Sequence, residues 1–195
     1  MRKTALTLSL MAACVLSAVA QTPSTPPPSQ GSGAASAPPA VYANMNQLMR
    51  GVLYPAANVV FFAQADNPAD VKWVEGRDPA MATDPLASVF GGWQAVENAA
   101  LALAESASLL SIPGRTCENG VPVPVKDPAW ETFVQQVRDE SMKSYAAAKA
   151  KDQDKIIELS LALSNSCTNC HRRFRDRRGG AANRCKVEPV PAPAK

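Results

Sequence analysis

The residues best suited to chemistry stand together near the end of the chain, in the run Cys167-Thr168-Asn169-Cys170-His171. Two thiols three positions apart on a helix lie about one turn apart, so both can add to the two vinyl groups along one porphyrin edge. The imidazole that follows directly can then bind the iron from the same turn. The chain has one His in all, and it falls directly behind the only Cys-x-x-Cys pair. The spacing therefore predicts one covalent haem c with its iron, attached through Cys167 and Cys170, with His171 as the proximal iron ligand.

Two other kinds of cysteine site compete with this interpretation. A thioredoxin-like dithiol needs a strand–helix–strand context, and no segment of this sequence shows the alternation of a strand. A four-cysteine zinc site made of Cys117, Cys167, Cys170 and Cys185 is open on ligand count, but it leaves His171 without a role. The haem interpretation uses all three residues of the motif, so we prefer it.

The first twenty residues predict export. Arg2 and Lys3 precede an apolar run, and Ala18-Val19-Ala20 offers the small residues that signal peptidase needs. The alternative is a lipoprotein signal with Cys14 as the lipid acceptor. We expect a periplasmic protein in either case, attached to a membrane only if Cys14 is lipidated.

Composition divides the rest of the chain. Residues 21–40 are Pro, Ser, Gly, Thr and Ala without periodicity, which predicts a flexible linker. Residues 41–178 carry the periodic segments and form the predicted haem-binding domain, and residues 179–195 form a C-terminal tail. The formal net charge of +3 gives no indication of nucleic-acid binding.

Four helices are expected, and no strand. The first runs from about Ala43 to Gln64, with a kink at Pro55 and an apolar face of Met45, Leu48, Met49, Val52, Val59 and Phe62. The second runs from about Leu86 to Ser111, with Val89 in its buried stripe. The third begins at Pro128 behind the cap Asp127, and the fourth opens at Asp152 or Asp154 and is stopped by Gly179-Gly180. Four helices joined by short or medium loops predict an all-α, antiparallel up-down-up-down four-helix bundle, with the haem near the C-terminal end of helix four.

This topology also predicts a disulfide. Helices two and four end at the same pole of such a bundle, and Cys117 and Cys185 each lie just beyond one of those ends. Free thiols rarely persist in an oxidising compartment. We therefore expect Cys117 and Cys185 to be paired.

Two stretches resemble the class II c-type cytochromes, which are cytochrome c′ and its low-spin relatives. They are Cys-Thr-Asn-Cys-His-Arg-Arg-Phe-Arg at 167–175 and Gln47-Leu48-Met49-Arg50 in the first helix, and the resemblance covers about Val41 to Arg178. It implies an electron carrier or a gas binder on a four-helix bundle. The long connection over 66–85 and the kinking Pro55 depart from the simplest members. Many members form homodimers, so the resemblance leaves a homodimer open.

The sixth iron ligand decides between these functions. In the resembling group, a first-helix position that matches Met49 holds Met in low-spin electron carriers and a non-ligating apolar residue in five-coordinate gas binders. We expect Met49 to be the distal ligand and the protein to transfer electrons with a redox partner protein. The alternatives are ligation by Met45, an open iron that binds NO or CO, and a structural or sensory haem domain.

No catalytic residue is expected, because a peroxidase-like activity would need a distal acid–base group and the single His already has a role. The haem-bearing helix ends in a basic run, Arg172, Arg173, Arg175, Arg177 and Arg178. Such a run can compensate the helix dipole. It can also contact a haem propionate, for which Arg175 is the candidate, or dock an acidic redox partner.

Overall fold

The description rests on a computed structural model, which describes residues 39–72, 76, 86, 87 and 89–187. Residues from Pro39 onward form one compact unit of their own. The predicted signal peptide, nearly all of the predicted linker and the last part of the tail lie outside the described residues. In the part of the chain that is described, the regular elements are all helical, and the only β-type pairing is an isolated bridge between Thr116 and Pro122. The predicted all-α class is confirmed.

The first helical stretch has three parts: α1 (Met45–Leu48), the π segment η1 (Met49–Leu53) and α2 (Tyr54–Ala65). It begins at a capping box, in which the Asn44 side chain accepts from the Gln47 N–H and the Gln47 side chain accepts from the Asn44 N–H, both at 2.9 Å. Pro55 has no N–H to donate, and its ring crowds the carbonyl four residues earlier. The helix widens over the preceding turn, where the Tyr54 N–H donates to the Met49 carbonyl. The distortion expected at Pro55 thus takes the form of a π turn.

The π turn changes which residues of this helix are buried. An α-helix would follow Leu48 with position 52 on the same face, but a π turn holds one more residue. Leu53 is accordingly buried, whereas Val52 is 37% exposed and Phe62 is 44% exposed. The predicted apolar face was therefore wrong at Val52 and Phe62, whereas Val59 is partly buried against the core, as predicted. The buried positions are Met45, Leu48, Leu53, Ala57, Val60 and Ala63.

The second predicted helix begins seven residues later than expected, at α3 (Trp93–Ser106), and continues as the 3₁₀ segment η3 (Ala107–Ser111). Gly92 sets this start, because its φ of 60° and ψ of −140° are open to glycine and hardly to other residues. A Cβ on Gly92 would also lie 2.9 Å from the Pro68 carbonyl oxygen. The expected start at Leu86 was wrong, and Val89 of the predicted stripe is 54% exposed. The expected end at Ser111 is confirmed.

The last two long helices are α4 (Pro128–Ala150) and α5 (Gln153–Cys170). Asp127 caps α4 by accepting from the Ala129 N–H at 2.8 Å, and Asp152 caps α5 by accepting from the Lys155 N–H at 2.9 Å. A π segment, η4 (His171–Arg175), extends α5, and a short 3₁₀ turn, η5 (Gly180–Asn183), follows. The helical run therefore ends at Arg175, before the predicted stop at Gly179-Gly180.

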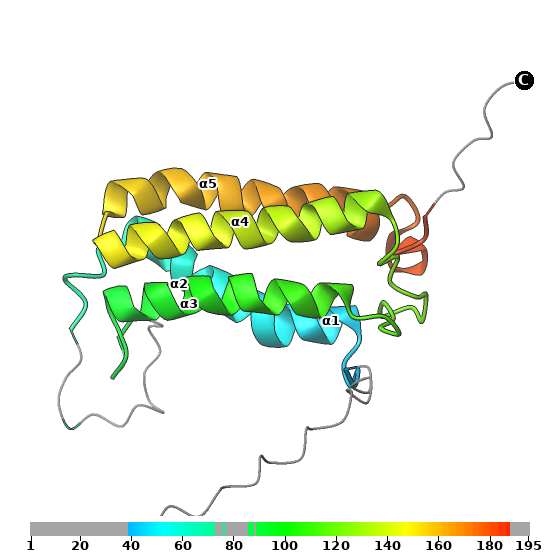
Figure 1. The fold of residues 1–195 in the computed structure, drawn as a ribbon, viewed down its shortest axis with the longest axis horizontal. Coiled ribbons are helices and arrows are strands. Elements are labelled where there is room, and N and C mark those ends of the chain that lie inside the picture. The colour runs from blue at the N-terminus through cyan, green and yellow to red at the C-terminus, as the bar shows by residue number, and fades with distance from the viewer. Residues whose placement is uncertain (1–38, 73–75, 77–85, 88, 188–195) are drawn as a thin grey trace, which may run out of the picture. The chain divides into compact units, whose positions relative to one another are not determined.

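The helices pack as neighbours around an apolar interior. Helix α4 lies against α3 and α5, and α2 lies against α3 and α5, as Figure 1 shows. Two core clusters result. One surrounds Leu163 and Phe174, at the end of the fold where α5 finishes, and the other surrounds Trp93 and Ile156. Among the described residues, no helix combines the length and the hydropathy that crossing a membrane requires.

Candidate haem-attachment site

The three motif residues lie where α5 passes into its π segment. Cys167 and Cys170 occupy the last turn of α5, and His171 opens η4. Positions three apart on a helix share a face, so the two thiols lie on one side of α5. Both cysteines are free and half-buried, and Cys170 packs against the core cluster around Leu163 and Phe174. The structure thus presents two thiols and an imidazole together at the edge of the core.

Burial controls the protonation of these groups. It raises the pKa of the Cys167 thiol, and it raises the pKa of Cys170 to about 12, with a further contribution from the charge of Cys167. Both groups are therefore neutral thiols at neutral pH. Burial also lowers the pKa of His171, and the nearby positive charge of Arg175 lowers it further. His171 is consequently a neutral imidazole at neutral pH, which is the form that binds a metal ion.

Phe174 anchors the turn that follows His171. Its side chain is 3% exposed, and its ring meets those of Trp130 and Phe133 edge-on, at centroid distances of 5.0 and 6.2 Å. The Asp176 N–H donates to the His171 carbonyl at 2.8 Å and closes the π turn. The position of His171 is therefore fixed by an aromatic contact to α4 as well as by its own helix.

Arg175, which the sequence suggests as a propionate contact, already has a carboxylate partner. Its Nε and Nη2 donate to the two carboxylate oxygens of Asp176 at 2.7 and 2.9 Å, and the side chain is about half exposed. This side-on pair lowers the pKa of Asp176. Arg175 would have to leave Asp176 in order to bind a propionate with the same edge.

Met49, the predicted distal ligand, is the first residue of η1. It is half-buried and packs against the same core cluster as Cys170, while Met45 and Leu48 are buried in that cluster. The first helix packs against α5 through α2, whereas η1 packs against α3. In Figure 1, accordingly, α2 runs up to α5, but α1 and the last turns of α5 lie well apart. The first helix thus diverges from α5 toward the end that carries the motif.

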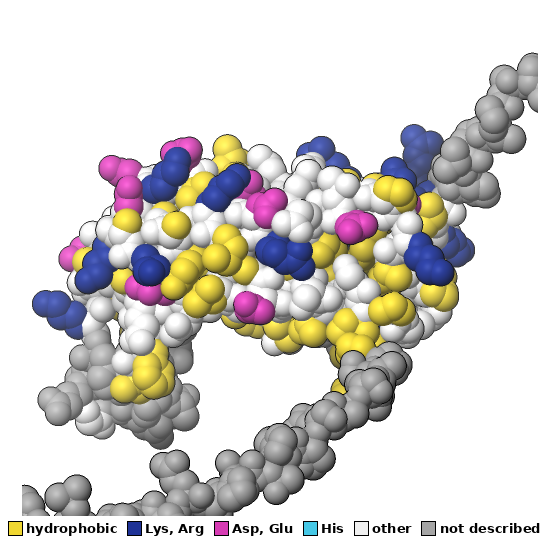
Figure 2. All heavy atoms as spheres, in the orientation of Figure 1, with side chains coloured by type: hydrophobic (Ala, Val, Ile, Leu, Met, Phe, Trp, Pro, Cys, Tyr) yellow, Lys and Arg dark blue, Asp and Glu magenta, His cyan; other side chains and the backbone are white. Residues whose placement is uncertain are grey.

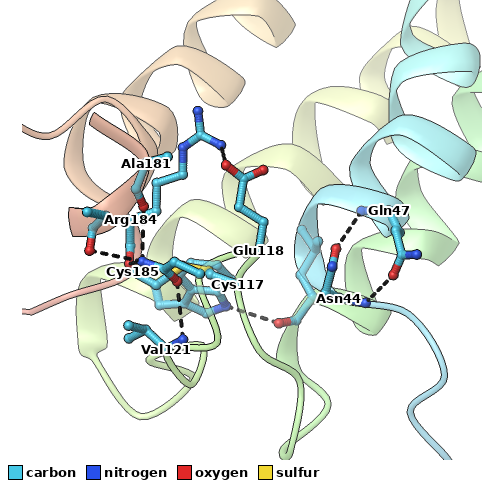
Figure 3. The surroundings of a disulfide bond; sticks show 12 residues. Asn44, Gln47, Cys117, Glu118, Val121, Ala181, Arg184 and Cys185 are labelled. Carbon is cyan, nitrogen blue, oxygen red and sulfur yellow. Dashed lines mark hydrogen bonds and ion pairs between the residues drawn. A yellow bond between two sulfur atoms is a disulfide. The ribbon is translucent and has the colours of Figure 1, made fainter. Parts of the chain in front are cut away.

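A disulfide joins Cys117 to Cys185, as the sequence predicts, with 6.4 Å between their Cα atoms and both side chains buried. We call the surrounding structure the disulfide junction; it consists of the loop 115–123 and the tail segment 181–185 (Figure 3). The Asn119 amide donates to the carbonyls of Ala181, Ala182 and Arg184 at 3.0–3.2 Å. Arg184 also pairs with Glu118. These contacts hold the tail against the loop.

The junction reaches both helices that carry predicted iron ligands. On one side the Cys185 N–H donates to the Phe174 carbonyl at 2.8 Å, in the turn after His171. On the other side the Met45 N–H donates to the Thr116 carbonyl at 2.8 Å, and the Asn46 amide donates to Glu118 at 2.7 Å. Sequence reasoning found the disulfide but missed Glu118 and Asn119, because their partners lie more than sixty positions away and follow no periodic pattern.

The disulfide also bears on the competing zinc site. It takes two of the four thiols that such a site would need, Cys117 and Cys185, and leaves Cys167 and Cys170 as the free pair. No group of three or more His, Cys, Asp or Glu side chains placed to hold a metal ion occurs within the described part of the chain. The four-cysteine arrangement is therefore not formed in this structure.

The end of the fold that carries the motif is basic. Between positions 172 and 186 the chain has six Arg and one Lys against a single Asp. Arg173 pairs with Asp127 at 3.3 Å, while Arg172 and Arg178 are exposed and have no ion pair with any residue that the structure describes. On the face drawn in Figure 2, few acidic side chains lie at this end, whereas acidic and basic side chains mix at the opposite end.

Comparison of the chain with family models, with curated proteins and with solved structures gives no match.

Proposed function

We propose that this protein is an exported monohaem c-type cytochrome of class II, an electron carrier built on an antiparallel up-down-up-down four-helix bundle. Cys167 and Cys170 attach the haem near the C-terminal end of the last helix, His171 binds the iron, and Met49 is the distal ligand. The proposal depends on one observation above all. Two free, half-buried thiols in the last turn of α5 are followed directly by a neutral imidazole at the first position of η4, while the other two described cysteines are joined to each other.

The surroundings of the motif suit an apolar group. Cys170 borders a core cluster that also includes Met45, Leu48 and Met49, all apolar. The first helix packs against α5 mainly through α2, whereas η1 packs against α3. These features support a group inserted between η1 and the end of α5.

The roles of the residues follow from their chemistry. Each thiol would hold the haem by adding across one vinyl group, with one C–S bond and one C–H bond replacing the S–H bond and the vinyl π bond, so that no atom is lost and no oxidant is needed. Neutral His171 supplies a lone pair to the iron, and the turn anchored by Phe174 holds the imidazole in place. The Met49 thioether is an uncharged ligand that favours ferrous iron and raises the reduction potential. The haem iron supplies a one-electron couple, so no acid–base residue is required.

The basic end gives the carrier a way to meet its partner. Arg172 and Arg178 are exposed, have no ion pair within the described part of the chain and lie close in sequence to His171. Complementary charge accelerates association more than it tightens a complex, which suits a carrier that must also dissociate. The redox partner protein would therefore present an acidic surface to this end.

One observation favours a second function, the binding of NO or CO at a five-coordinate iron. Met45 and Leu48 are buried on the face of the first helix beside Met49, and Met49 itself is only half-buried. If the Met49 thioether does not reach the iron, these side chains form an apolar distal wall that a small neutral gas can enter.

The test uses the protein matured in a host that attaches haem c. Acid–acetone extraction should leave the chromophore on the polypeptide, and the intact mass should equal apoprotein plus one haem. A Cys167→Ser/Cys170→Ser variant is the control that should lose the chromophore. Release of haem from the wild-type protein, or a mass equal to apoprotein, contradicts the proposal. The absorption spectrum then decides between the two functions, since Met ligation gives low-spin iron and an open site gives high-spin iron.

A further inference from the structure

One buried cation near the motif has no partner that balances its charge. Arg115 opens the loop 115–123 and is 5% exposed. Among the described residues, the Arg115 side chain makes one hydrogen bond, in which Nη1 donates to the Ala43 carbonyl. The Arg115 backbone carbonyl accepts from the Val123 N–H. Its buried Nε has no partner. A buried guanidinium without an anion is expensive, because its solvation is lost and nothing replaces it.

The free part of Arg115 has the shape that a carboxylate requires. Nη1 is used by Ala43, which leaves the edge formed by Nε and Nη2. That edge binds a carboxylate side-on through two parallel hydrogen bonds. Arg175 shows the same mode on this protein, since its Nε and Nη2 both donate to Asp176.

The carboxylates that the structure describes at this end are already engaged. Glu118 pairs with Arg184 and accepts from Asn46, Asp127 pairs with Arg173, and Asp176 pairs with Arg175. Arg184 also has a buried free Nε, but Glu118 already balances its charge. Arg115 is thus the buried cation at this end that lacks an anion.

The position of Arg115 links it to both sides of the proposed haem. Its guanidinium bonds the carbonyl of Ala43, next to the cap of α1, and the following residue, Thr116, accepts from the Met45 N–H. Two residues after Arg115, the disulfide connects to Cys185, which bonds the turn after His171. An acidic group that enters between the first helix and the end of α5 would therefore arrive beside Arg115.

We propose that Arg115 is the binding residue for a carboxylate that enters with the cofactor, a haem propionate, and that its free Nε/Nη2 edge receives it. The inference rests on the proposed function, and it moves the propionate role from Arg175, which Asp176 occupies, to Arg115. The buried pair compensates the charge of Arg115. It also ties the carboxylate edge of the haem to the loop that holds the start of the first helix.

The test compares holoprotein variants by resonance Raman spectroscopy, whose propionate-bending band reports hydrogen bonding to the carboxylate. Arg115→Gln should shift this band away from its wild-type position. It should also lower the reduction potential, because a buried positive charge disfavours ferric haem and its removal makes the ferric state more stable. Arg115→Lys should restore most of the potential but not the band position, since Lys supplies the charge without the two-donor edge. Lys126→Gln removes an exposed charge at the same end and should leave the band unchanged.

An unchanged band in Arg115→Gln overturns the inference, as does an equal shift in Lys126→Gln. If Arg115→Gln does not accumulate, Arg115→Lys decides alone: a shifted band supports the pair and an unshifted band refutes it. If Arg115 instead binds a carboxylate from solution, the band should be unchanged in Arg115→Gln and the thermal stability of the wild-type protein should rise with added acetate. That result also refutes pairing of Arg115 with a propionate. A wild-type protein without covalent haem refutes the proposed function, whereas a haem-bearing protein with an inert Arg115 refutes this inference only.

Discussion

Removal of the Cys117–Cys185 disulfide should destabilise the protein strongly. The two cysteines are 68 positions apart, so their bond closes a large loop in the unfolded chain. The loop-entropy relation gives about 4 kcal/mol for a loop of this length. In a folded unit of this size, such a loss lowers the melting temperature by about 10 °C.

The perturbation is the double variant Cys117→Ala/Cys185→Ala, which leaves no single thiol to mispair. Urea unfolding of the holoprotein measures the free energy of unfolding and the m-value. The m-value should rise, because the unfolded chain without the cross-link exposes more surface. Wild-type protein with its disulfide reduced is the matched control and should lose a similar amount of stability, since the proposed haem thioethers would resist thiol reductants.

The reasoning would be refuted by a loss below about 1 kcal/mol with an unchanged m-value, because the loop term alone exceeds that value. A large loss in the double variant with no loss in the reduced wild type would place the effect in the buried side chains and not in the cross-link.

Three further predictions follow from particular side chains. Met49→Leu should cost less than about 1.5 kcal/mol, yet turn a low-spin spectrum high-spin and open the iron to CO; a wild-type protein that is already high-spin would contradict Met49 ligation. Phe174→Ala should cost about 3–5 kcal/mol in urea unfolding, because the buried ring contacts Trp130, whereas Phe62→Ala, at 44% exposure, should cost much less. Gly92→Ala should destabilise the protein by more than about 1 kcal/mol, because Gly92 has a φ of 60° and lies close to Pro68. Gly51→Ala is the control and should be neutral or stabilising, because the space around its Cβ position is open. Equal melting temperatures for the two variants would refute this account.

The sequence was most informative where signals are local. The motif at 167–171, the cap Asp127 and the end of the second helix at Ser111 each depend on a few adjacent residues, and the structure places helices where these signals predict them. Of the predicted face of the first helix, Val59 does pack partly buried against the core, but the continuous face could be read only as far as Met49. Beyond it the π turn shifts the register by one residue, so Leu53 replaces Val52 in the core.

Long-range contacts were the part that the sequence could not supply. The close approach of Gly92 to Pro68, 24 positions earlier, cannot be read from the sequence, although the pair Gly91-Gly92 is a local signal for a helix boundary at this point. The partners of Arg115 and Asn119 are likewise separated from them in the chain by some sixty residues or more. Only the Cys117–Cys185 pair was foreseen among such contacts, because the expected topology brings two helix ends to one pole.

The disulfide also determines how the protein responds to cleavage. The ring closed by Cys117 and Cys185 contains all of α4, all of α5 and the proposed haem-attachment residues. A protease that cuts after the exposed Lys151, between α4 and α5, would leave the two fragments joined through that bond. On a gel stained for haem, the nicked protein should keep its full apparent size without reductant and fall to a short haem-bearing fragment with it.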